Sequence, residues 1–398
     1  MKELFYKGNF GIERETLRVD NKGKLAQTPH PFGEDPRITR DFCENQLELI
    51  TPVCPSLREA LKELEKLDAA VNSTLSNQGE HIWMYSNPPH FNNENDIPVA
   101  KFSGKHTGKR LYRENLQRRY GKRLMLFSGI HFNFSFSDEY LRKICNCTDF
   151  RTFKDEFYLR LYKQLSIYSW LPLLLTAASP VYDLSLYKDG EIGAVTSNYA
   201  SIRSGDQGYW NEFEPILDHS DLSSFVDSIK NYVDKGTLFS ASELYLPVRL
   251  KPVGVNSIDN FKNGVSHIEL RMFDLNPTKK QGIDETDLVF SHLLIMYLSK
   301  KEDFIYTKQM QQEAIRNHKN AALLDLKNIK IDGIPIISRA KQVISDMKTF
   351  YKDDSNAQSV LDYEYMKLDD RLCFQVKADE IYRQEGDIDV RAARVLSG

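Results

Sequence analysis

Acidic side chains at short spacing are the residues of this sequence best suited to chemistry. Glu13 and Glu15 lie two positions apart, so in a strand they would point to the same side, where like charges repel unless a cation lies between them. Further carboxylates follow in residues 41–48 and at Glu269. A group of carboxylates with one imidazole suits Mg²⁺ or Mn²⁺ better than zinc, which prefers cysteine and several histidines. Because Mg²⁺ is commonly shared between carboxylates and phosphate oxygens, this ligand set indicates chemistry on ATP.

Glycine-rich nucleotide loops are missing from the sequence. No GxxxxGK[ST], GxGxxG or GxSxG segment occurs in its 398 residues. If the protein uses ATP, we therefore expect a metal ion and arginines to hold the phosphates. On these residues alone, a metal-dependent phosphatase or nuclease remains an alternative, and it predicts hydrolysis without an amine acceptor.

Three segments that alternate between polar and apolar residues would position these groups. They cover residues 131–136, 243–251 and 267–272, and in a strand alternate side chains face opposite sides. Their polar faces consist of His131, Asn133 and Ser135; of Glu243, Tyr245, Pro247, Arg249 and Lys251; and of His267, Glu269 and Arg271. The opposite faces hold phenylalanines or aliphatic residues.

These polar faces have two interpretations. The commonest cause of such alternation is a sheet with one side on helices and the other in solvent. A solvent face is usually rich in Lys, Glu, Thr and Gln, whereas these faces hold His, Tyr, Asn and Arg. The pattern, together with the acidic pair, therefore favours a functional concave face.

Segments of helical periodicity separate the strands. Apolar residues recur at three- and four-residue spacing in residues 57–76, and similar patterns cover 155–175 and 286–298. Residues after Pro335 are also helical in character and heavily charged. Helices of varied length, without regular βαβ alternation, predict an α+β fold.

The composition is that of an ordinary soluble protein. The net charge is -3, from 53 basic and 56 acidic residues, and such a balance gives no field that attracts nucleic acid or a membrane surface. The first residues hold no signal-peptide stretch, and the longest mainly apolar run, 170–178, is too short to span a bilayer. We therefore expect a cytoplasmic protein without nucleic-acid or membrane partners.

Ordered motifs resemble one family. Residues 11–18 (GIERETLR) and 39–52 (TRDFCENQLELITP) resemble the opening motifs of bacterial glutamate–cysteine ligases, also called γ-glutamylcysteine synthetases. The resemblance continues in the family's order to about residue 290. Its further blocks include LYRENL at 111–116, SGIHFNFS at 128–135, SIR at 201–203, GY at 208–209, ELY at 243–245 and HIELRMFDLNP at 267–277.

The resemblance implies a glutamine-synthetase-like fold, in which a curved antiparallel sheet forms a funnel-shaped active site surrounded by helices. It also implies roles for single positions. The implied metal ligands are Glu13, Glu15, Asp41, Glu48, His131 and Glu269, with Glu44 as a weaker candidate. Arg203 matches the position that holds the α-carboxylate of glutamate, and the implied cysteine pocket consists of Tyr112, Leu116, Tyr209 and Tyr245. Arg113 and Arg271 match residues near the transferred phosphoryl group.

The implied activity is that of an ATP- and Mg²⁺-dependent ligase, with Mn²⁺ as an alternative metal. It would join the side-chain carboxylate of glutamate to the amino group of cysteine through a γ-glutamyl phosphate, the first step of glutathione biosynthesis. One alternative is a γ-glutamyl ligase with another amine acceptor. Another is a non-catalytic binding protein of the same fold, which would have lost metal ligands, whereas all six positions here hold competent side chains.

Two features depart from the family pattern. Met125 stands where longer members carry a glutamine that helps to hold glutamate. The chain is also short and lacks the ATP-grasp extension of the bifunctional fusions, so we expect a separate glutathione synthetase to act next. Residues 1–300 are expected to form the catalytic core, and 301–398 a mainly helical region packed on it.

Overall fold

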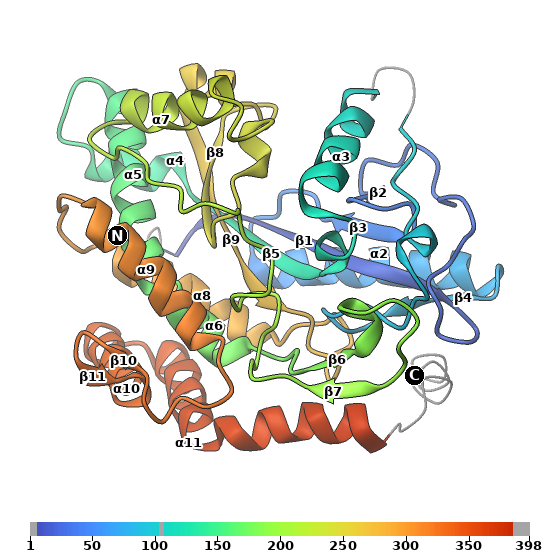
Figure 1. The fold of residues 1–398 in the computed structure, drawn as a ribbon. Helices are drawn as coiled ribbons and strands as arrows, with labels where there is room; N and C mark the ends of the chain where they lie inside the picture. Colours follow the sequence, from blue (N-terminus) through green and yellow to red (C-terminus); the bar gives the residue numbers. More distant parts are fainter. Residues whose placement is uncertain (1–5, 103–106, 385–398) are drawn as a thin grey trace.

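A seven-stranded antiparallel sheet forms the centre of the protein (Figure 1). The computed structural model describes residues 6–102 and 107–384. Within these residues the strands lie in the order β2–β3–β1–β5–β9–β8, and β4 pairs with the second half of β1. The strands are β1 (Gly8–Asp20), β2 (Ile38–Arg40), β3 (Gln46–Ile50), β4 (Glu80–Trp83), β5 (Gly129–Phe136), β8 (Val248–Pro252) and β9 (Val265–Asp274). Two small hairpins add β6 (Val181–Asp183) with β7 (Ala194–Thr196), and β10 (Lys330–Ile331) with β11 (Ile334–Pro335).

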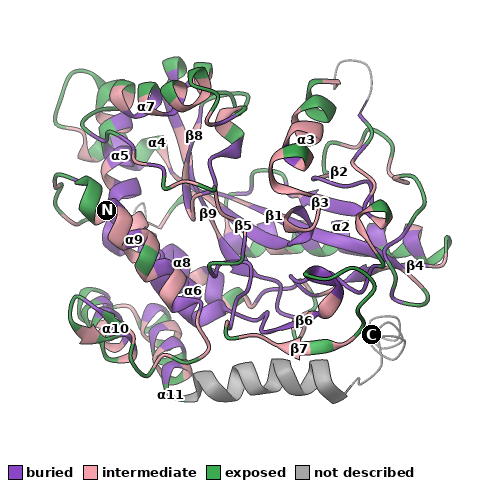
Figure 2. Ribbon diagram, in the orientation of Figure 1, coloured by how far each residue is buried: buried purple, intermediate pink, exposed green. Residues whose placement is uncertain are grey.

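Helices cover the apolar face of this sheet and enclose the main core (Figure 2). The phenylalanines of β5 pack there with apolar residues of β9 and of the helices. The helices are α2 (Leu57–Ser76), α3 (Thr107–Tyr120), α4 (Asp138–Ile144), α5 (Phe150–Tyr168), α6 (Trp170–Thr176), α7 (Leu222–Asp234), α8 (Glu285–Leu298), α9 (Lys308–Ala321), α10 (Ile336–Phe350) and α11 (Ser355–Gln384). The mixed α+β architecture expected from the sequence is confirmed.

Most of the expected elements form within a few residues of their predicted bounds. α2 covers the expected 57–76, and its first turn is capped by Ser56, whose side chain accepts a hydrogen bond from the Glu59 amide. The expected helix 155–175 is instead two helices, α5 and α6, which meet at Ser169. Pro172 lies in the first turn of α6, where its missing N–H costs no helical bond.

The strand expected at 243–251 is wrong in its first half. Glu243 ends a short 3₁₀ helix, η5 (Ala241–Glu243), and the strand β8 begins only at Val248. Pro247 has no N–H to give to a neighbouring strand. The Leu244 carbonyl accepts hydrogen bonds from the Arg249 guanidinium, at 2.6 Å and 3.1 Å, so a side chain satisfies it. Tyr245 is therefore held by a loop.

The helices after residue 300 lie against the rest of the molecule. α9 contacts α5 and α6, and α11 contacts α6, α8 and α10. The boundary expected at residue 300 stays a prediction, because the main core continues from the sheet into α10 and α11. Among the described helices, none combines the length and the apolar character needed to span a membrane.

Glu364 on α11 gives a pH-dependent stability prediction. Its side chain is fully buried, and Lys367 Nζ lies 3.0 Å from it and 2.6 Å from Asp287, so one cation faces two carboxyl groups. Burial raises the pKa of Glu364 to about 8, and the charge of Asp287 adds to this rise against the opposing charge of Lys367.

The folded protein therefore resists ionisation of Glu364, while the unfolded chain ionises near the ordinary pKa of about 4.3. The contribution of Glu364 to stability is complete below that value and is lost as pH rises toward 8. We expect the free energy of unfolding of the wild type to fall by about 2–4 kcal/mol relative to that of Glu364→Gln as the pH rises from 5 to 8. Urea unfolding of both proteins at each pH measures this difference. A difference between the two proteins that does not change with pH would contradict this assignment.

Candidate active site

The register of the central strands places the predicted polar groups on one face of the sheet. Glu13 on β1 lies opposite His131 on β5, and Glu15 lies opposite Glu48 on β3. Glu269 on β9 lies opposite Asn133 and Arg249. His131 is 2% exposed and Glu269 is 0% exposed, so the solvent-face interpretation is wrong.

These groups line a cavity of about 290 Å³. Except for Arg203 and the weaker candidate Glu44, all the predicted site residues line it, namely Glu13, Glu15, Asp41, Glu48, Tyr112, Arg113, Leu116, His131, Tyr209, Tyr245, Glu269 and Arg271. Glu44 lies outside this lining, and its carboxylate is bound by Arg40 and by the backbone amides of His30 and Lys101. The weaker candidate ligand therefore has a structural role.

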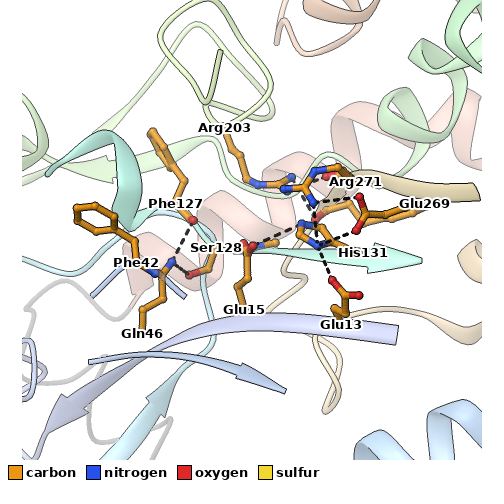
Figure 3. A network of polar contacts seen from close by, with 12 residues as sticks. Glu13, Glu15, Phe42, Gln46, Phe127, Ser128, His131, Arg203, Glu269 and Arg271 are labelled. Carbon is orange, nitrogen blue, oxygen red and sulfur yellow. Dashed lines mark hydrogen bonds and ion pairs between the residues drawn. The ribbon is translucent and has the colours of Figure 1, made fainter. Parts of the chain in front are cut away.

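His131 lies at the centre of the acidic group (Figure 3). Its Nδ1 is 3.2 Å from Glu13 Oε2 and 3.9 Å from Glu269 Oε1, and its Nε2 is 3.4 Å from Glu15 Oε1. Glu13, His131 and Glu269 each offer an atom within 4.8 Å of the other two. Three side chains that could ligate a cation, from three adjacent strands, thus converge on one point.

Two cations border this group. Arg271 Nη1 lies 3.2 Å from Glu269 Oε2 and 3.3 Å from His131 Nδ1, and Lys251 Nζ lies 2.9 Å from Glu269 Oε1. Burial of Glu269 would raise its pKa, but the charges of Lys251 and Arg271 outweigh that effect and hold the pKa well below its ordinary value. Glu269 is therefore ionised at neutral pH.

The remaining carboxylates repel one another. Removal from bulk water raises the pKa of Asp41 to about 6, and the charge of Glu15 adds to the rise. The pKa of Glu48 lies well above its ordinary value. Loss of solvent is the larger cause, and repulsion from Glu13 and Asp41 is the smaller one. Loss of solvent is thus the larger cause of both rises, and repulsion among the carboxylates adds to it.

The donor set fits a divalent cation. Burial and the charge of Arg271 lower the pKa of His131 to about 4, so its imidazole is neutral and can act as a ligand. His131 Nε2 is buried and makes no hydrogen bond. Oxygen ligands with one imidazole nitrogen suit Mg²⁺ or Mn²⁺, and such a cation would relieve the repulsion among the carboxylates.

Aromatic residues form the other wall of the cavity. The rings of Tyr209 and Tyr245 have centroids 4.1 Å apart, and Tyr120 meets Tyr245 edge-on at 5.7 Å. Tyr112 on α3 stacks on Phe239 at 6.2 Å. The expected tyrosine pocket therefore lies in the same cavity as the acidic group, and Leu116 adds an apolar surface to it.

Arg203 lies beside this cavity. It lines a smaller cavity of about 40 Å³, which shares Tyr209, Tyr245 and Arg271 with the larger one. Its guanidinium donates hydrogen bonds to the carbonyls of Arg271 at 2.7 Å and Phe273 at 3.4 Å. Met125 lines neither cavity and packs in a second apolar cluster with Leu116 and Tyr245.

Sequence reasoning missed four polar residues of the lining, Ser242, Arg249, Lys251 and Asn256, and two apolar ones, Phe42 and Ile50. Arg249 and Lys251 stood on a predicted polar strand face and could have been chosen on that signal. Arg113 is predicted near the phosphoryl group, and its guanidinium donates to the carbonyls of Arg40 and Asp41 at the edge of the cavity.

Comparisons with known proteins agree with this architecture. The sequence profile described as glutamate–cysteine ligase matches residues 1–238 and 233–321. The glutamate–cysteine ligase of Clostridium acetobutylicum is 31% identical over 450 aligned positions, which cover 94% of this chain and 93% of that protein. The crystal structure of a glutamate–cysteine ligase from Francisella tularensis, in complex with AMP, superposes with a TM-score of 0.85 at 25% identity, covering 98% of this chain and 88% of that one.

Bifunctional relatives match as well. The glutathione biosynthesis bifunctional protein GshAB of Clostridium perfringens is 34% identical over 371 residues, covering 87% of this chain and 47% of that protein. The chain thus spans about half the length of these bifunctional relatives. The profile match and the similarity to the Clostridium acetobutylicum ligase along nearly its whole length lead to one conclusion: this chain belongs to the glutamate–cysteine ligase family.

Proposed function

We propose that this protein is an ATP-dependent glutamate–cysteine ligase. The observation that carries the proposal is a single cavity with a carboxylate–histidine cluster on one wall, tyrosines on the other and Arg271 between them. A metal-dependent phosphatase or nuclease would have no use for the tyrosine wall. Family membership supports the same activity.

The architecture of helices around one antiparallel sheet is consistent with this proposal. We infer that the antiparallel sheet corresponds to the glutamine-synthetase-like funnel, with the polar face of β1, β5 and β9 as its inner surface. Residues 1–300 would form the catalytic core, and the helices that follow would buttress α5, α6 and α8.

The acidic cluster would hold Mg²⁺, or Mn²⁺ in its place. Glu13, His131 and Glu269 are the residues closest to one shared point, and Glu15, Asp41 and Glu48 supply further oxygen ligands on the same wall. Such a cation would supply positive charge against the negative charge that develops during phosphoryl transfer.

The other residues would orient the two amino acids and the phosphates. Arg271 can pair with phosphoryl oxygens, and Arg203 with the α-carboxylate of glutamate. The γ-carboxylate of glutamate would attack the terminal phosphorus of ATP, releasing ADP and giving γ-glutamyl phosphate. The amine of cysteine would then displace phosphate. The tyrosine wall, which is apolar but carries hydroxyl groups, suits a short polar amino acid.

Another amine is the main alternative acceptor, because the acceptor pocket is made by a few side chains. The product, γ-glutamylcysteine, would be the substrate of a glutathione synthetase. Relatives named glutathione biosynthesis bifunctional protein match this chain along about half of their length.

ADP release from ATP and Mg²⁺ is the direct test. It should require both glutamate and cysteine, and mass spectrometry should find γ-glutamylcysteine. Chelation of the metal with EDTA should stop release, and added Mg²⁺ or Mn²⁺ should restore it. Release that depends on glutamate but ignores cysteine would keep the phosphoryl chemistry and overturn cysteine as the acceptor.

Replacing Tyr245 by alanine tests the acceptor pocket. The ring of Tyr245 is 4% exposed and contacts Tyr209 and Tyr120, so its loss opens a hole in that wall. We expect the KM for cysteine to rise by about tenfold or more, with the KM for glutamate changed far less. Initial rates at varied cysteine and varied glutamate measure both constants. An equal rise in both would contradict the pocket assignment.

A further inference from the structure

Glu243 is a buried carboxylate next to the active-site cavity whose role no part of the proposed reaction explains. It ends η5, its exposed fraction is 0%, and it is absent from the lining of the cavity. A buried carboxylate without partners is costly, so its contacts indicate its role. All of them lead to segments that carry the aromatic wall.

The first set of contacts fixes α3. Glu243 Oε1 accepts hydrogen bonds from Arg119 Nη1 and from the Tyr120 hydroxyl, each at 2.8 Å. Arg119 and Tyr120 form the last turn of α3, the helix that brings Tyr112 and Leu116 to the cavity. Of the described residues of α3, only Leu116 is buried, and Tyr112 and Tyr120 pack half-buried against the same apolar cluster.

The second set fixes the loops on either side. Glu243 Oε2 accepts a hydrogen bond from the Phe239 amide at 2.6 Å, and the Phe239 ring stacks on Tyr112. Asn211 Nδ2 donates to the Glu243 carbonyl at 2.7 Å and to the Tyr120 hydroxyl at 3.2 Å.

Asn211 completes the network. Its Oδ1 accepts the Tyr245 amide at 2.9 Å, and it follows Tyr209 by two residues. The carboxylate of Glu243 and the amide of Asn211 therefore join the three segments that supply Tyr112, Tyr209 and Tyr245. These segments are far apart in the sequence, and the bonds of Glu243 to α3 span 123 and 124 positions.

We propose that Glu243 is a positioning residue that sets the selectivity of the acceptor pocket by holding its three tyrosine-bearing segments together. The inference rests on the proposed function, since it assumes that the tyrosine wall binds the amine acceptor. Glu243 itself lies outside the cavity lining. It would act by fixing the positions of the tyrosine rings.

A carboxylate is required at this position because all of its partners are donors. Both oxygens of Glu243 accept hydrogen bonds, from Arg119 and Tyr120 on one side and from Phe239 on the other. In Glu243→Gln, the amide nitrogen replaces one of the two oxygens and therefore opposes either the Phe239 N–H or the Arg119 guanidinium, so at least one bond is lost. The shape is kept, while either the Phe239 amide or α3 loses its bond to residue 243; Arg119 keeps its bonds to the carbonyls of Gly236 and Thr237.

The test separates the acceptor from the other substrates. For Glu243→Gln we expect the KM for cysteine to rise by about tenfold or more, with the KM values for glutamate and ATP within about twofold of wild type. The loosened wall should also discriminate less, so the preference for cysteine over serine or 2-aminobutyrate should fall. A general loss of folding would lower kcat without such a split between substrates.

Two further variants keep the test informative. Tyr120→Phe removes the hydroxyl that bridges Glu243 and Asn211 but keeps the ring, so it should shift the cysteine KM in the same direction by a smaller factor. Glu80→Gln is the matched control, because Glu80 is also buried and pairs with an arginine, Arg18, at 2.5 Å, but lies outside the cavity lining. It should leave the ratio of KM values unchanged.

Three results would each overturn the positioning role. The KM values for cysteine, glutamate and ATP could rise equally in Glu243→Gln, or the KM for cysteine could stay unchanged in both Glu243→Gln and Tyr120→Phe. The third is a selective rise of the cysteine KM in Glu80→Gln as well. A wild-type enzyme that ignores cysteine would instead overturn the proposed function. In that case the split between acceptor and glutamate is measured with the amine that the wild type accepts.

Discussion

Replacing Glu269 by glutamine is expected to lower kcat by about a thousandfold or more while the fold is kept. Glu269 is fully buried, lies 3.9 Å from His131, and is held by Lys251 and Arg271. The amide has nearly the same shape as the carboxylate but no charge, so it is a poor ligand for a hard cation. The amide also leaves Lys251 and Arg271, whose side chains are 12% and 15% exposed, without their shared charged partner, so that two positive charges border the proposed metal site.

Metal affinity and turnover should fall together in this variant. Mn²⁺ binding, followed by electron paramagnetic resonance, gives a readout that does not depend on catalysis, and thermal unfolding reports on the fold. Glu44→Gln is the matched control, because Glu44 is also a buried carboxylate, but it pairs with Arg40 and lies outside the cavity lining. It should keep its Mn²⁺ affinity. Near-normal Mn²⁺ binding and turnover in Glu269→Gln would remove Glu269 from the ligand set.

The local part of this site could be predicted from the sequence. Alternation in β5 and β9 fixes which side chains share a face, because successive residues of a strand point to opposite sides. The pairing of those strands could not be predicted in the same way. Glu13 meets His131 across 118 positions, and no local pattern determines which residues stand opposite one another.

The errors lie where side chains replace regular backbone pairing. The segment 243–247 alternates like a strand, yet the Arg249 guanidinium takes the Leu244 carbonyl and Pro247 has no N–H to donate. The tyrosine expected on a strand face therefore lies in a loop held by Asn211. Arg203 lies beside the main cavity, where two backbone carbonyls bind its guanidinium, and its role toward glutamate stays a prediction. The roles of single residues stay predictions until they are measured.

Gly129→Ala is expected to reduce kcat/KM for glutamate by about a hundredfold with little loss of stability. Gly129 begins β5, and a Cβ built there falls well inside van der Waals contact of the Arg203 guanidinium. The clash involves the far end of a flexible side chain, so Arg203 can swing away and the fold survives. The guanidinium that we propose for the α-carboxylate of glutamate is then displaced. The Gly129 amide also donates to Glu15 Oε2 at 3.0 Å, so any shift of the backbone moves a proposed metal ligand as well.

Gly11→Ala provides the matched control for this substitution. Gly11 lies on the neighbouring strand β1, opposite Asn133, and an added Cβ meets only the Asn133 Cβ at 3.5 Å, an ordinary contact. The KM for glutamate should therefore rise in Gly129→Ala and stay near wild type in Gly11→Ala, with similar unfolding midpoints for both. If Gly129→Ala binds glutamate normally, the orientation of Arg203 is irrelevant to that substrate. A loss confined to Mn²⁺ binding would instead assign the effect to Glu15, since the two groups touch Gly129 through different atoms.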